Sequence, residues 1–445
     1  MGVEYFYTHF FISASKEVFL AGALKGFSMK KKLLCLIFVI AITLSLSSCY
    51  LLTDISDLYY GGGLSQDKLP SDATINVTGG DNNNITINTE SAAEQLAANK
   101  ALLSAVSVYC NFERVSYGFM TQDVTGAGSG VIYKLDKENG DAYIITNYHV
   151  VYDASSTTKN RISDDISIYL YGMENMTNDG RTYAIPAVFV GGSMNYDIAV
   201  LKVTGSTLLM ESNARACDVY DSDEVTILET AIAIGNPQAE GISATIGSIS
   251  VDSEEIFISF DNKDGSSTTV KFRVLRTDAA VNSGNSGGGL FNDNGELMGI
   301  VCARDPDSKV VNVSYAIPSN VATAIADNAI YYSDGTVKRC LLGVTVGVSE
   351  YSTFYDTETG KVHKIEEVIV SEISSTSGVK GLIYVGDIIN SITVDGVEHE
   401  VTRIHHVVDS MLYARVGSSV TINVTRGGTE MNITVPITES MRTVA

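Results

Sequence analysis

A serine set among glycines is the feature of this sequence that most directly suggests chemistry. The stretch VNSGNSGGGL, residues 281 to 290, places Ser286 in a G-x-S-x-G pattern. Glycines take φ values closed to other residues and let the backbone approach a substrate closely. Ser286 would then be a nucleophile, with the N–H groups of Gly284 and Ser286 as an oxyanion hole. The same letters also describe a flexible turn, so the partners of Ser286 must decide.

A serine nucleophile needs a base that takes its proton and an acid that orients the base. Between residues 49 and 340 the sequence contains one histidine, His149, in YIITNYHVV at the end of an apolar run. Asp197 stands directly before another apolar run, in YDIAVLKV. We predict His149 as the general base and Asp197 as its orienting partner, although each residue taken alone fits a structural role equally well.

The order of these three residues separates two unrelated hydrolase designs. In α/β-hydrolases the G-x-S-x-G serine precedes both the acid and the histidine. Here the first histidine after Ser286 is His363, which falls in a separate predicted domain, and no alternation of strands and helices surrounds the motif. The order His149, Asp197, Ser286 is that of chymotrypsin, and we therefore set the hydrolase interpretation aside.

Strands must position these residues. From about residue 106 to 330, short apolar runs are separated by Gly, Asn and Asp, which is typical of an antiparallel barrel or sandwich. A helix is predicted over about 91–104, and about 230 residues suit one all-β unit made of two barrels. The predicted domains are a leader (1–48), a tether with the short helix (49–104), a protease domain (105–335) and a smaller C-terminal domain (336–440).

The N-terminal segment indicates export. Lys30 to Lys32 precede an apolar run over 33–46 and the small residues of LSSC, as in a secretory signal peptide. LSSC resembles a bacterial lipobox, which implies a lipid attached to Cys49 and a lipoprotein of the bacterial cell envelope, anchored to a membrane on the extracytoplasmic side. We expect translation to start at Met29, and an uncleaved anchor is the alternative.

Five segments, TNYHVV, YDIAVLKV, AIAIGNP, TDAAVNSGNSGGGLFN and VSYAIPSN, together resemble the HtrA/Deg family of trypsin-like serine proteases. The resemblance implies a chymotrypsin-like double six-stranded β-barrel and the catalytic roles given above for His149, Asp197 and Ser286. Ser283 and Gly289 stand where the family usually has proline, which predicts a more mobile loop before substrate binds.

The resemblance also implies a function. We expect an ATP-independent serine endoprotease of the cell envelope that degrades unfolded or misfolded exported proteins and needs no cofactor. The family commonly forms trimers through N-terminal aromatic residues, for which Tyr117 and Phe119 are the candidates. The alternative is a chaperone or adhesin that uses the same fold to bind proteins without turnover.

Ala280, six residues before the predicted nucleophile, is expected at the base of the P1 pocket of a chymotrypsin-like site. Its side chain is small and uncharged, so we predict cleavage after Val, Ala, Ile or similar residues. Asp278 is interpreted as structural, because it belongs to the loop that enters the site.

The C-terminal domain resembles, more loosely, a small α+β PDZ domain, through RCLLGVTV, VGDIINSITVDGVEH and RVGSSVTINVTRGG. PDZ domains bind peptide C-termini at a sheet edge, and the resemblance assigns that role to Leu341, Leu342, Gly343 and Val344, faced by a helix over about 404–413. The inserted stretch EYSTFYDTETGKVHKIEE predicts a protruding hairpin. His405 and His406 are neighbours on the helix and should point apart, so we predict a solvated helix face and no metal site.

Composition excludes other classes of function. A formal net charge of −22 argues against nucleic acid as a partner. The cysteines beyond the leader, Cys110, Cys217, Cys302 and Cys340, are scattered without a CxxC pair, which argues against a metal cluster. Export would permit disulfides, but the spacing selects no pairing.

Overall fold

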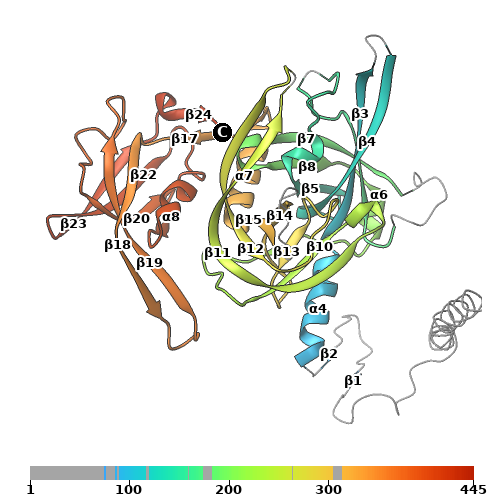
Figure 1. The fold of residues 1–445 in the computed structure, drawn as a ribbon, viewed down its shortest axis with the longest axis horizontal. Helices are drawn as coiled ribbons and strands as arrows, with labels where there is room; N and C mark the ends of the chain where they lie inside the picture. Colours follow the sequence, from blue (N-terminus) through green and yellow to red (C-terminus); the bar gives the residue numbers. More distant parts are fainter. Residues whose placement is uncertain are drawn as a thin grey trace, which may run out of the picture. The chain divides into compact units, whose positions relative to one another are not determined.

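The computed structural model describes residues 75–76, 86–87, 90–116, 120–158, 160–173, 183–262, 264–303 and 313–445 (Figure 1). Contacts divide the chain into two units, Met1–Thr86 and Ile87–Ala445, and the second holds the candidate site. In the first unit, strand β1 (Ile75–Asn76) pairs with β2 (Thr86–Ile87), whose last residue begins the second unit. The predictions for the leader, Cys49, Tyr117 and Phe119 lie outside the described residues.

The first barrel follows from alternating apolar residues in six antiparallel strands. These are β3 (Ala105–Ser116), β4 (Met120–Asp136), β5 (Asp141–Thr146), β6 (Asp165–Leu170), β7 (Ile185–Ser193) and β8 (Ile198–Val203). They are paired in the order β7-β6-β3-β4-β5-β8, and a further pairing of β7 with β8 closes the sheet. Branched aliphatic side chains such as Val106, Ile132 and Ile168 fill the interior.

A second barrel repeats this plan with the strands coloured from yellow-green to orange in Figure 1. Its strands are β10 (Thr230–Gly235), β11 (Ser243–Asp261), β12 (Ser267–Thr277), β13 (Gly289–Phe291), β14 (Glu296–Ala303) and β15 (Ser314–Pro318). The order is β13-β10-β11-β12-β15-β14, closed by β13 with β14, and β9 (Asp218–Val219) adds a parallel edge to β14. Two closed six-stranded barrels confirm the predicted all-β protease fold.

Helices are few and cover the barrels. They are α4 (Glu90–Leu102), α5 (Tyr148–Val151), α6 (Thr207–Glu211) and α7 (Ser319–Tyr332). Helix α4 forms where the sequence predicts a helix, and it buries Ala97, Ala101 and Leu102 in the core. Helix α7 packs its small side chains on β7, β8 and β14. Within the described residues, no helix combines the length and apolar character needed to cross a membrane.

The C-terminal region contains a separate sheet and one helix. After β16 (Gly335–Thr336) come β17 (Lys338–Cys340), β18 (Val344–Tyr355), β19 (Val362–Ile373), β20 (Ile388–Val394), β21 (Val397–Glu400), α8 (Ile404–Ser410), β22 (Ser419–Arg426), β23 (Thr429–Pro436) and β24 (Arg442–Val444). The sheet order is β18-β19-β20-β22-β23, with β21 on β20, while β17 pairs with β24. The inserted stretch continues the β18–β19 ladder as far as Tyr355 and Val362, so the predicted hairpin is confirmed.

Candidate active site

The three predicted catalytic residues come from both barrels. His149 lies in α5, the short helix that follows β5, and Asp197 lies between the 3₁₀ turn Met194–Tyr196 and β8. Ser286 lies in the glycine-rich loop between β12 and β13. His149 and Ser286 line the same cleft, which has a volume of about 610 Å³.

Asp197 is fully buried and held by its backbone and its side chain. It is in the left-handed region at φ 50°, and its carbonyl oxygen accepts hydrogen bonds from Asn147 Nδ2 at 2.9 Å and Tyr148 N at 3.1 Å. Its Oδ1 accepts from the backbone N–H of His149 at 3.0 Å, and Oδ2 lies 2.8 Å from His149 Nδ1. The carboxylate therefore fixes both the main chain and the ring of His149, which leaves Nε2 for a substrate or nucleophile.

The electrostatics of His149 reflect this pairing. Burial opposes the charged imidazolium and by itself lowers the pKa of His149, but the charge of Asp197 and its hydrogen bond outweigh burial, so the pKa is raised above its usual 6.5. A histidine whose pKa is raised in this way remains suited to proton transfer near neutral pH.

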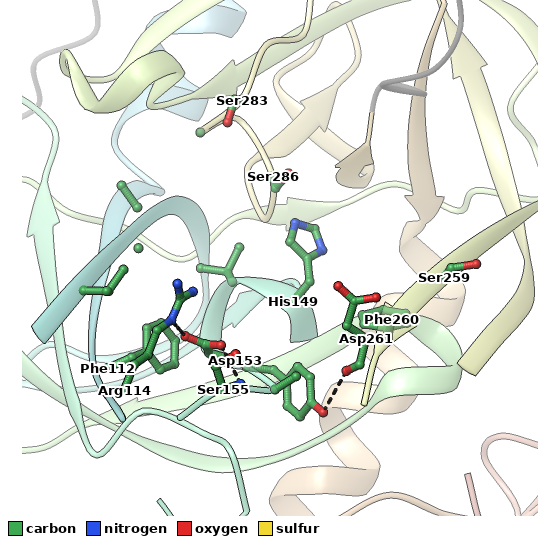
Figure 2. Close-up of a pocket in the computed structure, with 17 residues that line it drawn as sticks. Phe112, Arg114, His149, Asp153, Ser155, Ser259, Phe260, Asp261, Ser283 and Ser286 are labelled. Atoms are coloured by element: carbon green, nitrogen blue, oxygen red, sulfur yellow. Dashed lines mark hydrogen bonds and ion pairs between the residues drawn. The ribbon is translucent and has the colours of Figure 1, made fainter. Parts of the chain in front are cut away.

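Ser286 does not yet engage the base. Its Oγ donates a hydrogen bond to the carbonyl oxygen of Cys302 at 3.3 Å, and no hydrogen bond joins it to His149, both residues being among those described. Figure 2 shows the imidazole pointing toward the loop that carries Ser286. A rotation about the Cα–Cβ bond of Ser286 would bring Oγ toward Nε2, as expected of a site that tightens on substrate binding.

The conformation of the loop requires glycine at positions 284 and 287. Gly284 has φ 99°, and a β-carbon there would lie 2.2 Å from the carbonyl oxygen of Asn236. Gly287 has φ 86°, and its β-carbon would lie 2.2 Å from the carbonyl oxygen of Ser129. Among the hydrogen bonds of the described residues, none has the backbone N–H of Gly284 or Ser286 as donor. The role of these two N–H groups as an oxyanion hole stays a prediction.

Ser129 of β4 is a supporting residue that sequence reasoning missed. Its N–H donates to the carbonyl oxygen of Ser286 at 2.8 Å, and its hydroxyl donates to that of Gly284 at 2.7 Å. The same hydroxyl accepts from Asn236 N at 2.7 Å. Ser129 thus fastens the loop to the first barrel, and its place inside strand β4 gives no local sequence signal of that role.

The two positions that lack proline, Gly289 and Ser283, both make contacts within the site. A β-carbon at Gly289 would lie 2.2 Å from the ring of Phe291, so that ring occupies the space that a larger residue would need. The carbonyl oxygen of Ser283 accepts a hydrogen bond from Gln238 N at 2.7 Å. The predicted mobility of this loop stays a prediction, but these contacts favour an ordered loop.

The prediction about specificity rests on Ala280 and stays a prediction. Ala280 is not among the residues that line the cleft of the candidate site, and its carbonyl oxygen accepts from Thr245 Oγ1 at 2.8 Å. Asp278 Oδ1 accepts from Ser248 N at 2.6 Å, a contact that supports the structural role predicted for it. The cleft itself contains Arg114, paired with Asp153 at 2.5 Å, and Asp261 (Figure 2). Sequence reasoning had not singled out these charges.

The C-terminal region has its own apolar groove, of about 160 Å³. Its lining combines the four predicted peptide-binding residues Leu341, Leu342, Gly343 and Val344 with Val407, Val408, Met411 and Leu412 from α8 and its end, together with Tyr196 and Arg339. Residues 341–344 and the α8 segment thus line one groove, while peptide binding there stays a prediction.

The remaining predictions concern cysteine and histidine. Among the described residues, Cys110, Cys217, Cys302 and Cys340 form no disulfide, and burial raises the pKa of Cys110 and Cys217 to about 12. The prediction of a solvated face at His405 and His406 is wrong. His406 is 8% exposed, the two rings lie 4.6 Å apart, and burial lowers the pKa of both.

Comparison with known proteins identifies the family. The sequence model described as "Trypsin-like peptidase domain" matches residues 128–300. "Serine protease Do-like HtrA" of Lactococcus lactis subsp. cremoris is 31% identical over 323 residues, which cover 68% of this chain and 70% of that protein. The chain belongs to the HtrA family of trypsin-like serine proteases.

Other members of the HtrA family match as well. "Serine protease Do-like HtrA" of Bacillus subtilis is 35% identical over 50% of this chain and 43% of its own length. "Periplasmic serine endoprotease DegP" of Escherichia coli K12 is 30% identical over 73% of this chain and 59% of its own length. The chain thus spans about half the length of these relatives. Among solved structures, "HtrA-type protease AlgW with decapeptide" is 25% identical, covers 78% of this chain and 98% of its own, and has a TM-score of 0.47.

Proposed function

We propose that this member of the HtrA family is a serine endoprotease in which Ser286 attacks the peptide carbonyl. The observation that carries the proposal is the 2.8 Å contact between Asp197 Oδ2 and His149 Nδ1 in the cleft that Ser286 also lines. His149 would take the proton of Ser286 and return it to the leaving amine, while Asp197 stabilises the imidazolium. The N–H groups of Gly284 and Ser286 would bind the oxyanion.

The substrates would be unfolded or misfolded exported proteins, cleaved without ATP. The relative DegP, named above as a periplasmic serine endoprotease, supports a location in the cell envelope, and LSSC supports a lipid on Cys49 as the anchor. Cleavage after Val, Ala or Ile rests on the uncharged Ala280. A homotrimer formed through Tyr117 and Phe119 rests on the family resemblance alone.

The C-terminal region would act as a PDZ domain that binds peptide C-termini. Support comes from the apolar groove between Leu341–Val344 and α8, because a terminal carboxylate could meet the backbone N–H groups of the Leu342–Gly343 turn. A hydrophobic last residue of the peptide would fill the space beside Val407 and Met411.

Labelling with a fluorophosphonate tests the nucleophile. We expect the full chain to be labelled and to digest casein, and we expect Ser286→Ala to do neither. Ser129→Ala is the control, because Ser129 supports the loop but is not the nucleophile. We expect Ser286 in this variant still to react with the fluorophosphonate, but more slowly.

The second candidate is a protein-binding chaperone or adhesin without turnover. One observation favours it: the Ser286 hydroxyl donates its hydrogen bond to the carbonyl oxygen of Cys302 and not to His149. If the wild type stays unlabelled and casein stays intact even with a hydrophobic C-terminal peptide added, the chaperone is the better assignment.

A further inference from the structure

A second cleft, of about 630 Å³, lies where the C-terminal region meets the second barrel. None of His149, Asp197 and Ser286 lines it. Four of the six histidines of the chain do: His363, His399, His405 and His406. Seven carboxylate side chains line the same cleft, against three basic ones. Such a site is rich in groups that bind cations.

Three of these side chains converge on one point. Asp223 precedes β10, whereas His405 and His406 open helix α8. One ligand atom from each lies within 4.8 Å of the other two. The imidazoles meet edge to face, with ring centroids 4.6 Å apart and planes at 89°, and His406 Nε2 lies 3.8 Å from Asp223 Oδ1.

Neighbouring groups orient the side chains of His406 and Asp223. His406 Nδ1 lies 3.1 Å from the carbonyl oxygen of Glu400 and 3.3 Å from the backbone nitrogen of Thr402. In the tautomer that carries the proton on Nδ1, this nitrogen donates to Glu400, and the lone pair of Nε2 faces Asp223. Asn320 Nδ2 donates to Asp223 Oδ2 at 3.1 Å, which leaves Oδ1 toward the histidines. Metal-binding histidines and carboxylates are normally held by outer partners of this kind.

The positively charged side chain of Arg273 contacts the cluster. Arg273 Nη2 lies 3.2 Å from Asp223 Oδ1, but it lies closer, 2.7 Å, to Asp409 Oδ2. Arg273 can therefore keep its contact with buried Asp409 when a metal takes the free lone pair of Asp223. The exposed side chain of Asp223 has room to make that adjustment.

We propose that Asp223, His405 and His406 bind a zinc ion that ties helix α8 to the segment before β10. Two imidazoles and one carboxylate suit zinc in preference to calcium or magnesium, which select oxygen ligands. Three protein ligands leave a fourth position for water. With zinc–ligand distances of about 2.0–2.2 Å, the ligand atoms must close to roughly 3.4 Å from one another, which asks for movements on the order of 1 Å.

The site would act on the helix that also forms the apolar groove. His405 and His406 lie at the start of α8, while Val407, Val408 and Met411 of the same segment line the groove. Zinc would fix one end of this helix to the protease barrel. The proposal concerns the contact between domains and does not depend on turnover at Ser286.

Metal titration of the full chain in the Ser286→Ala background, which prevents self-digestion, tests the site. Calorimetry with Zn²⁺ should give one ion per chain, and Co²⁺ should give the intense visible absorption of a four-coordinate site. Asp223→Asn, His405→Gln and His406→Gln should each weaken binding by at least about tenfold. His363→Gln, in the same cleft but outside the cluster, is the matched control and should bind as tightly as the parent.

Three results would overturn the proposal: no Zn²⁺ binding by the parent, unchanged affinity in the three variants, or loss of binding on His149→Gln instead. Melting curves recorded without metal identify a variant that has lost its fold. If the His406→Gln variant does not fold, the variants at the more accessible Asp223 and His405 test the proposal.

Discussion

At the scale of single residues, the strongest feature is that one buried carboxylate holds both the main chain and the ring of one histidine. Asp197 uses Oδ1 for the His149 backbone N–H and Oδ2 for Nδ1. A carboxylate held from both sides cannot turn away, so the tautomer with a free Nε2 is set before substrate arrives.

This arrangement makes a prediction about pH. The base must be neutral to act, so kcat/KM should fall as the pH drops through the pKa of His149. Burial alone would lower that pKa, but Asp197 raises it above 6.5, so the midpoint of the acid limb should lie above 6.5. Asp197→Asn removes the charge, and the midpoint should move to lower pH while the rate falls by roughly 10⁴-fold.

The measurement is kcat/KM for a chromogenic peptide with Val before the scissile bond, from about pH 5 to 9. Ser286 labelling controls for loss of the site. An Asp197→Asn variant whose acid limb coincides with that of the wild type would contradict the assignment of Asp197.

The grouping of His149 with Asp197, and of His149 with Ser286 in one cleft, could be predicted from the sequence because histidine is rare and the order of the three residues is informative. One histidine between residues 49 and 340 leaves no competitor for the base. Ser129 could not be predicted, because its role depends on the close approach of β4 to a loop 155 residues further along the chain. Serine is common, and nothing in its local sequence reports such a contact.

At the scale of elements, the loop between β12 and β13 depends on its conformation as much as on its nucleophile. The positive φ of Gly284 and the 2.2 Å that would separate its β-carbon from Asn236 make alanine doubly unfavourable there. The chain offers a matched control in Gly265, which has φ 80° and no atom within 4 Å of its would-be β-carbon.

We predict that both Gly284→Ala and Gly265→Ala lower the free energy of unfolding, by about 1 kcal/mol for the conformational effect alone. Only Gly284→Ala should also slow fluorophosphonate labelling, by roughly 100-fold or more, because the oxyanion donor is displaced. Urea denaturation and labelling rates measure the two effects. Equal labelling of the two variants would show that Gly284 is not part of the oxyanion hole.

The elements themselves were partly predictable. Alternation of apolar residues indicated the strands, but the pairings of β7 with β8 and β13 with β14 that close the barrels depend on contacts that no local pattern carries. His405 and His406 illustrate the opposite error. Ideal helix geometry separates neighbouring side chains, but at the first turn of α8 the two rings lean together against Asp223.

At the scale of the whole molecule, the apolar groove and the catalytic site are linked by a short path. Arg339 Nη1 donates to Tyr196 Oη at 3.3 Å, and both residues line the groove. Tyr196 ends the turn that directly precedes Asp197. A peptide that displaces Arg339 would therefore act on the residue next to the one that orients the base.

We predict that a peptide ending in a hydrophobic residue increases hydrolysis, and that Tyr196→Phe reduces the ratio of activity with peptide to activity without it. Phenylalanine keeps the ring in place and removes only the hydroxyl that Arg339 reaches, so peptide binding should persist. Calorimetry measures that binding, and peptide hydrolysis at saturating peptide measures the ratio. Tyr331→Phe, at an exposed tyrosine of α7, is the control. An unchanged ratio in Tyr196→Phe, with peptide bound, would exclude this contact as the route, because no other property of Tyr196 has been altered.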